Sequence, residues 1–76
     1  MSKETIEEKF GAVAEQKGFI SPTQFLKALE IQVKENVEEG KHRFIGSILL
    51  EEGFITRLQI NDVLEAMGET LMEGLL

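Results

Sequence analysis

The residues that this chain lacks limit its chemistry. It has no cysteine, no tryptophan and no tyrosine, and it has only one proline and one histidine. Without cysteine, it can form neither a disulfide framework nor a thiolate metal site. A single histidine and a single aspartate also leave no catalytic triad and no metal-binding constellation. We therefore expect a noncatalytic protein with no metal and no resident cofactor.

Long apolar runs and an excess of basic residues are missing as well. No apolar run approaches the roughly 20 residues that cross a bilayer, and the charged N-terminal segment 1–5 lacks the apolar core of a signal peptide. We therefore expect a cytoplasmic protein that does not insert into a membrane. The net charge is −6. Because nonspecific nucleic-acid binding relies on Lys and Arg to neutralise phosphates, this charge argues against a nucleic-acid partner.

The apolar residues that are present recur at helical spacing, which predicts an all-α fold. A chain of 76 residues makes one small domain, residues 1–76. Gly68 is expected to break or kink the last helix before a short C-terminal helical segment, which either packs on the core or contacts a partner. The expected helices cover residues 2–17, 22–39, 44–52 and 57–67, and the first has two possible starts, capped by Ser2 or by Thr5.

One apolar stripe runs along the second expected helix, and we expect it to face the core. It is formed by Phe25, Leu26, Leu29, Val33 and Val37.

The chain repeats itself after 35 positions, residues 9–32 matching residues 44–67. Each copy contains a Gly-Phe-Ile-Ser/Thr phrase, beginning at Gly18 and at Gly53. Gly suits the left-handed position that ends a helix, and Ser or Thr with Gln three residues later forms the capping box that starts the next. We therefore predict two pseudo-symmetric helix-corner-helix units that bury their apolar faces against each other.

Gly11 and Gly46 lie inside helical patterns, where Gly costs about 0.5–1 kcal/mol relative to Ala. Something is therefore expected to approach the backbone closely at both positions. One interpretation is contact between helices across the pseudo-two-fold axis, and the other is a flat ligand lying on bare backbone.

The repeated motif resembles the N-terminal domain of type II secretion and type IV pilus assembly ATPases, the MshEN-like family, which includes cyclic di-GMP-binding members. The family motif opens with Arg-Leu-Gly and closes with Gln, with a second Gly and two Leu at fixed spacings between them. Both copies keep these spacings. The first reads Lys9-Phe10-Gly11, Gly18, Phe25, Leu29, Gln32, and the second reads Phe44-Ile45-Gly46, Gly53, Ile60, Leu64, Met67.

The resemblance implies a set of candidate ligand-binding residues, although both motif Arg positions have changed. Lys keeps the charge of Arg without its planar fork, and Phe44 keeps only an aromatic face. Arg43, one position earlier, is a candidate replacement, and the alternative is that residues 41–43 form a solvated loop. The candidates are Lys9, Phe10, Gly11, Gly18, Gln32, Arg43, Ile45, Gly46 and Gly53.

Three functions are compatible with these observations. The first is a noncatalytic regulatory or protein-interaction module whose partner is a secretion or pilus assembly component, as the resemblance implies. The second is a receptor for cyclic di-GMP or a related nucleotide. The third is a structural domain whose partner domain lies on another chain. The sequence leaves the oligomeric state open.

Overall fold

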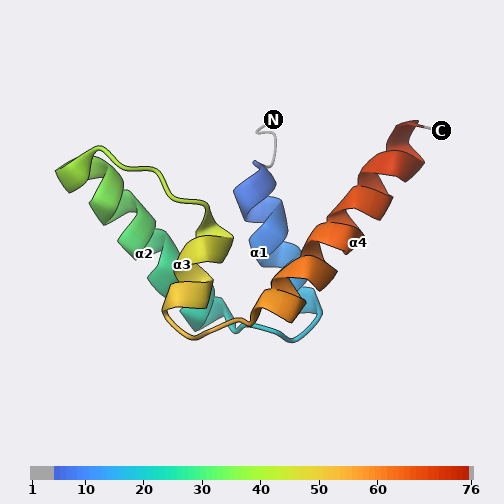
Figure 1. Cartoon of the computed structure of the whole chain (residues 1–76), viewed down its shortest axis with the longest axis horizontal. Helices are drawn as coiled ribbons and strands as arrows, with labels where there is room; N and C mark the ends of the chain where they lie inside the picture. Colours follow the sequence, from blue (N-terminus) through green and yellow to red (C-terminus); the bar gives the residue numbers. More distant parts are fainter. Residues whose placement is uncertain (1–4, 76) are drawn as a thin grey trace.

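The chain folds into four helices, as seen in a computed structural model that describes the backbone of residues 5–75 and the side chains of residues 5–68. This part of the chain contains no strand, so the all-α prediction is confirmed (Figure 1). The helices are α1 (Ile6–Gln16), α2 (Pro22–Glu39), α3 (Ile45–Glu51) and α4 (Arg57–Leu75).

The two glycine corners end α1 and α3 as the repeat predicts. Gly18 and Gly53 are left-handed, with φ of 77° and 79°. In each corner the following Phe N–H donates back into the helix, from Phe19 to Ala14 O at 3.0 Å and from Phe54 to a carbonyl in α3 at 2.9 Å. These bonds satisfy carbonyls that would otherwise lack a donor at the helix end.

Capping boxes start α2 and α4 directly after these corners. Ser21 Oγ accepts from the Gln24 N–H at 3.1 Å, and Gln24 Oε1 accepts from the Ser21 N–H at 2.9 Å. Thr56 and Gln59 make the same reciprocal pair at 3.1 and 3.0 Å. The predicted helix starts are therefore confirmed, and both follow from side chains within four residues of the boundary.

Of the two starts that the sequence allowed for α1, the structure has the later one. Thr5 is the N-cap, and its Oγ1 accepts from the Glu8 N–H at 3.1 Å. The earlier alternative, Ser2, lies outside the described residues.

Each unit packs on the other rather than on itself. The first helix of one unit contacts the second helix of the other, so α1 packs on α4 and α2 packs on α3, while α1 and α3 meet at the centre. Figure 1 shows α2 and α4 diverging from the end of the molecule where both corners lie, with α1 and α3 between them. This exchange lets each unit bury an apolar face that it could not bury alone.

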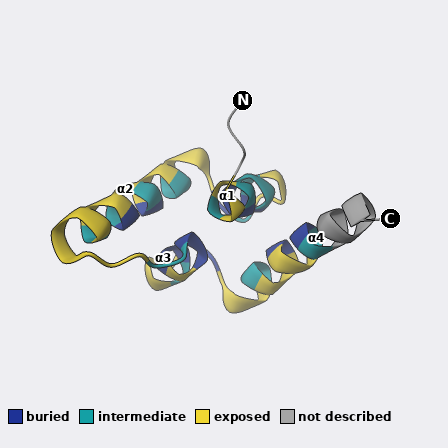
Figure 2. Ribbon diagram, turned by 90° about the horizontal axis from the view of Figure 1, so that it is seen from above, coloured by how far each residue is buried: buried dark blue, intermediate teal, exposed yellow. Residues whose placement is uncertain are grey.

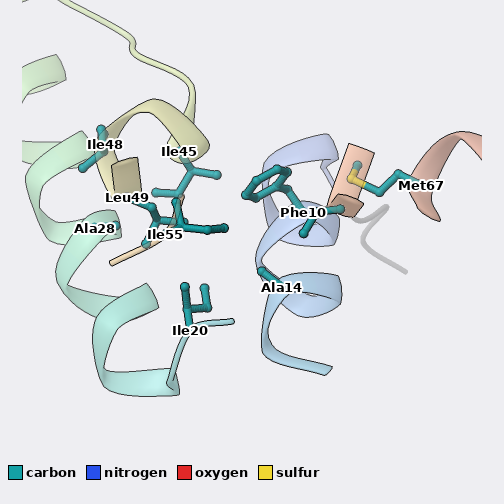
Figure 3. Packing of buried hydrophobic residues seen from close by; sticks show 10 residues of the cluster. Phe10, Ala14, Ile20, Ala28, Ile45, Ile48, Leu49, Ile55 and Met67 are labelled. Atoms are coloured by element: carbon teal, nitrogen blue, oxygen red, sulfur yellow. The ribbon is translucent and has the colours of Figure 1, made fainter. Parts of the chain in front are cut away.

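The core lies between α1, α3 and the two corners. Phe10 points from α1 toward Ile45 of α3, and Ile20 and Ile55 close the core from the corners (Figure 3). Its buried residues are Phe10, Ala14, Ile20, Ala28, Ile45, Ile48, Leu49, Ile55, Val63 and Met67.

The prediction that Gly68 separates a short C-terminal segment was wrong, because α4 continues through it to Leu75. Gly68 does not adopt the positive φ of the glycines that end helices. One Gly inside a helix costs only about 1 kcal/mol relative to Ala, which the rest of a long helix can absorb. Whether the side chains of this last stretch pack on the core falls outside the described residues.

The prediction that the α2 stripe faces the core was also wrong for most of its length. Leu26, Val33 and Val37 are 61%, 60% and 80% exposed. Figure 2 shows that only part of α2 is buried. The buried residues of this helix are Ala28 and Gln32. The small Ala28 and the hydrogen-bonded amide of Gln32 allow α2 to pack against α3 on this side. The most apolar side of the helix is therefore exposed to solvent.

Candidate functional site

The bare backbone at Gly11 and Gly46 is covered by aromatic rings of the chain itself. A Cβ added to Gly11 would lie 2.3 Å from the ring of Phe25. A Cβ added to Gly46 would lie 2.8 Å from the ring of Phe44 and 3.1 Å from Phe10 Cζ. The expected close approach is therefore present, and aromatic side chains make it.

Phe10 and Phe44 connect the two units at this point. Their ring centroids lie 5.2 Å apart with planes at 78°, an edge-to-face arrangement that aromatic pairs favour. Phe44 stands where the repeat places Lys9 in the first copy, so the residue that replaces the motif Arg here packs into the junction between the units.

Beside the rings, the Glu7 carboxylate ties α1 to α2 and α3. Its Oε1 accepts from Gln32 Nε2 at 2.7 Å and from the Ile45 N–H at 3.0 Å, while His42 Nε2 lies 3.2 Å from its Oε2. The Gln32 amide also donates to the Arg43 carbonyl at 2.8 Å. Gln32 is thus a buried polar residue whose amide bonds within the protein.

Glu7 supplies a cap that α3 cannot make locally. Phe44 occupies the N-cap position and has no side-chain acceptor, so the first N–H groups of α3 need a partner from elsewhere. Glu7 provides one from a residue 38 positions earlier. Sequence reasoning missed this role, and the one signal for it was a helix that starts without Ser, Thr, Asp or Asn.

Arg43, the candidate replacement for the motif Arg, is held by two carboxylates. It forms a bidentate pair with Glu35 at 2.9 and 2.7 Å, and its Nη1 bonds Glu51. The hydrogen bonds that Arg43 donates to Glu35 and then Glu51 raise the pKa of the guanidinium, and the bond to Glu35 lowers the pKa of that carboxyl below its usual value. Binding an anion at Arg43 would require these bonds to break.

The remaining sequence candidates do not converge on one cleft. Gly18 and Gly53 are exposed at the corner end of the molecule, where α1 and α3 finish, whereas Arg43 precedes the opposite end of α3 (Figure 1). Phe10 and Ile45 are fully buried in the core between these ends. Lys9 is half-buried, and no ion pair or hydrogen bond of its side chain occurs within residues 5–68.

A shallow apolar groove runs along the outer side of α2. We call it the α2 face. It is formed by Leu26, Leu29, Val33 and Val37, with Glu30, Lys34 and Glu38 beside them. All of these residues belong to one helix, so the groove is open along its length and has no second wall.

Within the described residues, no group of three or more His, Cys, Asp or Glu side chains could hold a metal ion. The helices of that same part of the chain include none that is long and apolar enough to cross a membrane.

The fold thus defines a small all-α domain of two interlocked helix-corner-helix units. Comparison with models of known families gives no match, and searches of curated proteins and of solved structures give no significant match either. The resemblance to the secretion and pilus domain therefore rests on the residues of the chain alone.

Replacing Glu7 with alanine is expected to lower the free energy of unfolding by about 2 kcal/mol, because it leaves the Gln32 amide and the Ile45 N–H without their shared acceptor. Urea unfolding followed by circular dichroism measures the change. Glu7→Gln retains an acceptor oxygen and should cost less. Glu8→Ala, an exposed change one residue away, should stay within about 0.5 kcal/mol. Equal losses in the Glu7→Ala and Glu8→Ala variants would contradict this role for Glu7.

Proposed function

We propose that the chain is a noncatalytic protein-interaction module, with a role like that of the N-terminal domains of secretion and pilus assembly ATPases, and that it acts through the α2 face. The observation that carries this proposal is the exposure of the most apolar side of the longest fully described helix. A contiguous apolar strip beside charged residues is typical of surfaces that bind proteins.

The form of the α2 face supports a protein partner over a small molecule. Small ligands are held in concave sites that bury most of their surface, and a groove on one helix has no second wall to enclose them. A partner helix laid along it would meet apolar residues at each turn. A cytoplasmic secretion or pilus assembly component remains the predicted partner.

The alternative, a receptor for cyclic di-GMP, rests on the motif spacing and on Lys9, whose ammonium has no ion pair within the described residues. Against it, the Gln32 amide and the Arg43 guanidinium bond other groups of the chain, and the glycine backbone lies under rings. A nucleotide would have to displace these contacts, so the interaction module is the better supported function.

Val37→Lys is expected to abolish binding to a purified secretion or pilus assembly component, because it places a charge within the apolar contact. The matched control is Leu58→Lys on α4, since Leu58 is 77% exposed and Val37 is 80% exposed. Calorimetry measures both variants, and circular dichroism confirms that both remain folded. Equal binding by the two variants would contradict the role of the α2 face.

Titration with cyclic di-GMP in the same study separates the two functions. An interaction module should give no change in the amide spectrum at millimolar nucleotide. Shifts clustered at Lys9, Gly11 and Gly46 that vanish in the Lys9→Ala variant would replace the proposal with the receptor alternative.

A further inference from the structure

The α2 face points directly away from the core. Successive residues of a helix turn by about 100°, which places Leu26, Val33 and Val37 together on the side opposite the buried Ala28. Leu29 lies at the edge of the strip, partly buried against the core. A second helix laid along this side would therefore contact α2 without disturbing the packing of α2 on α3.

Charged side chains form a single row along one flank of the α2 face, and their signs alternate. The row consists of Lys27, Glu30, Lys34 and Glu38, whose spacings of three and four residues keep them on one side of the helix. All four are exposed, and none has an ion-pair partner among the described residues. Their charges are thus available to a partner.

The row is complementary to itself when it is reversed. In an antiparallel pair of α2 helices, Lys27 would stand opposite Glu38 and Glu30 opposite Lys34, and the two-fold axis repeats both pairs. In a parallel pair, the two-fold axis would run along the helices and place the rows of the two copies on opposite sides of the interface, so the charges would not pair. The apolar residues also pair with each other in the antiparallel arrangement, because Leu26 would lie opposite Val37 and Leu29 opposite Val33.

We propose that the occupant of the α2 face is a second copy of this chain, bound antiparallel in a two-fold symmetric dimer. A two-fold axis perpendicular to the plane of two antiparallel helices brings each flank against the same flank of its copy, so the self-complementary row meets itself. This inference rests on the proposal that the α2 face binds protein, and it adds that a second copy covers the face until an assembly component binds. The dimer is the form that an assembly component would encounter or displace.

A pair of charge-reversed variants tests the pairing. Lys27→Glu with Lys34→Glu makes the row entirely acidic, and Glu30→Lys with Glu38→Lys makes it entirely basic. Sedimentation velocity of the wild-type chain from micromolar to millimolar concentration should show a shift from monomer to dimer. Each variant alone should remain a monomer, because like charges then face each other. An equimolar mixture of the two should recover the dimer.

Cysteine cross-linking tests the direction, and the chain offers a clean background because it contains no cysteine of its own. Leu26→Cys mixed with Val37→Cys should form a disulfide-linked dimer under mild oxidation. Leu26→Cys alone should not, since the two copies of position 26 would lie roughly 16 Å apart along the axis, beyond the ~7 Å between Cα atoms that a disulfide spans.

Three results would overturn the proposal: a wild-type chain that stays monomeric at millimolar concentration, a charge-reversed variant that still dimerises alone, or a mixture that stays monomeric. Cross-linking of the Leu26→Cys chain to itself would overturn the antiparallel arrangement. None of these results touches the binding of an assembly component through Val37, which calorimetry measures separately. Failure of the dimer and failure of the proposed function are therefore distinguishable.

Discussion

Replacing Phe10 with alanine is expected to leave the chain largely unfolded. Truncating a buried Phe costs about 3–5 kcal/mol, and small native domains often have little more than about 5 kcal/mol in total. Phe10 is fully buried, meets Phe44 edge to face and contacts the position of Gly46. Its loss would open a cavity where α1 and α3 meet.

The measurement is urea unfolding by far-ultraviolet circular dichroism, since the chain has no tryptophan or tyrosine to report by fluorescence. Ile6→Ala is the matched control on the same helix, because Ile6 is 66% exposed and its truncation should change the free energy of unfolding by less than about 0.5 kcal/mol. Phe10→Leu keeps most of the apolar volume and should fall between the two. A cost below about 1 kcal/mol for Phe10→Ala would contradict the central place of this ring in the core.

The helix boundaries could be predicted because they depend on residues close in sequence. A left-handed Gly, a Ser or Thr cap and a Gln three residues later decide a corner almost without reference to the rest of the fold. Gly68 fits the same view, because Leu71 stands three residues after it, at the spacing where Ser21 and Thr56 cap the next helix after the true corners. Where a Gly has no N-cap at that spacing, helix continuation is the better prediction.

The orientation of α2 could not be predicted in this way. Periodicity locates an apolar stripe and predicts that this stripe is the buried side. The structure buries the side with Ala28 and Gln32. That choice depends on Glu7, which accepts from Gln32 across 25 residues of sequence, and on the pairing of Arg43 with Glu35. Such contacts have no local signature.

The roles of the candidate ligand-binding residues could not be predicted either, because they depend on contacts between residues far apart in the sequence. The family motif implies that Gln32 contacts a nucleotide, yet its amide joins α1, α2 and the segment before α3. The closing Gln of the first copy thus has a structural role, and in the second copy Met67, which takes its place, is simply buried in the core. A motif can therefore keep its spacing while its polar residues serve the fold.

Gly11→Ala is expected to destabilise the chain by roughly 1–3 kcal/mol, although alanine favours helices by about 1 kcal/mol over glycine. The reason is steric, because the new Cβ would stand 2.3 Å from the ring of Phe25, which must then leave its place beside α1. Gly68→Ala is the matched control. No described residue lies within 4 Å of its added Cβ, so this change should stabilise the chain by about 0.5–1 kcal/mol.

A double-mutant cycle decides whether the Phe25 ring is the cause. In a Phe25→Ala background the clash is removed, so Gly11→Ala should become neutral or stabilising, and urea unfolding of the four chains gives the coupling energy directly. If Gly11→Ala instead stabilises the otherwise unchanged chain as Gly68→Ala does, the ring moves aside at no cost. Gly11 would then have no packing role. Because a Gly inside a helix is destabilising, its presence would then favour a ligand that binds at the α1 backbone. Whether Gly11→Ala lowers or raises the free energy of unfolding therefore separates the packing explanation of Gly11 from the ligand explanation.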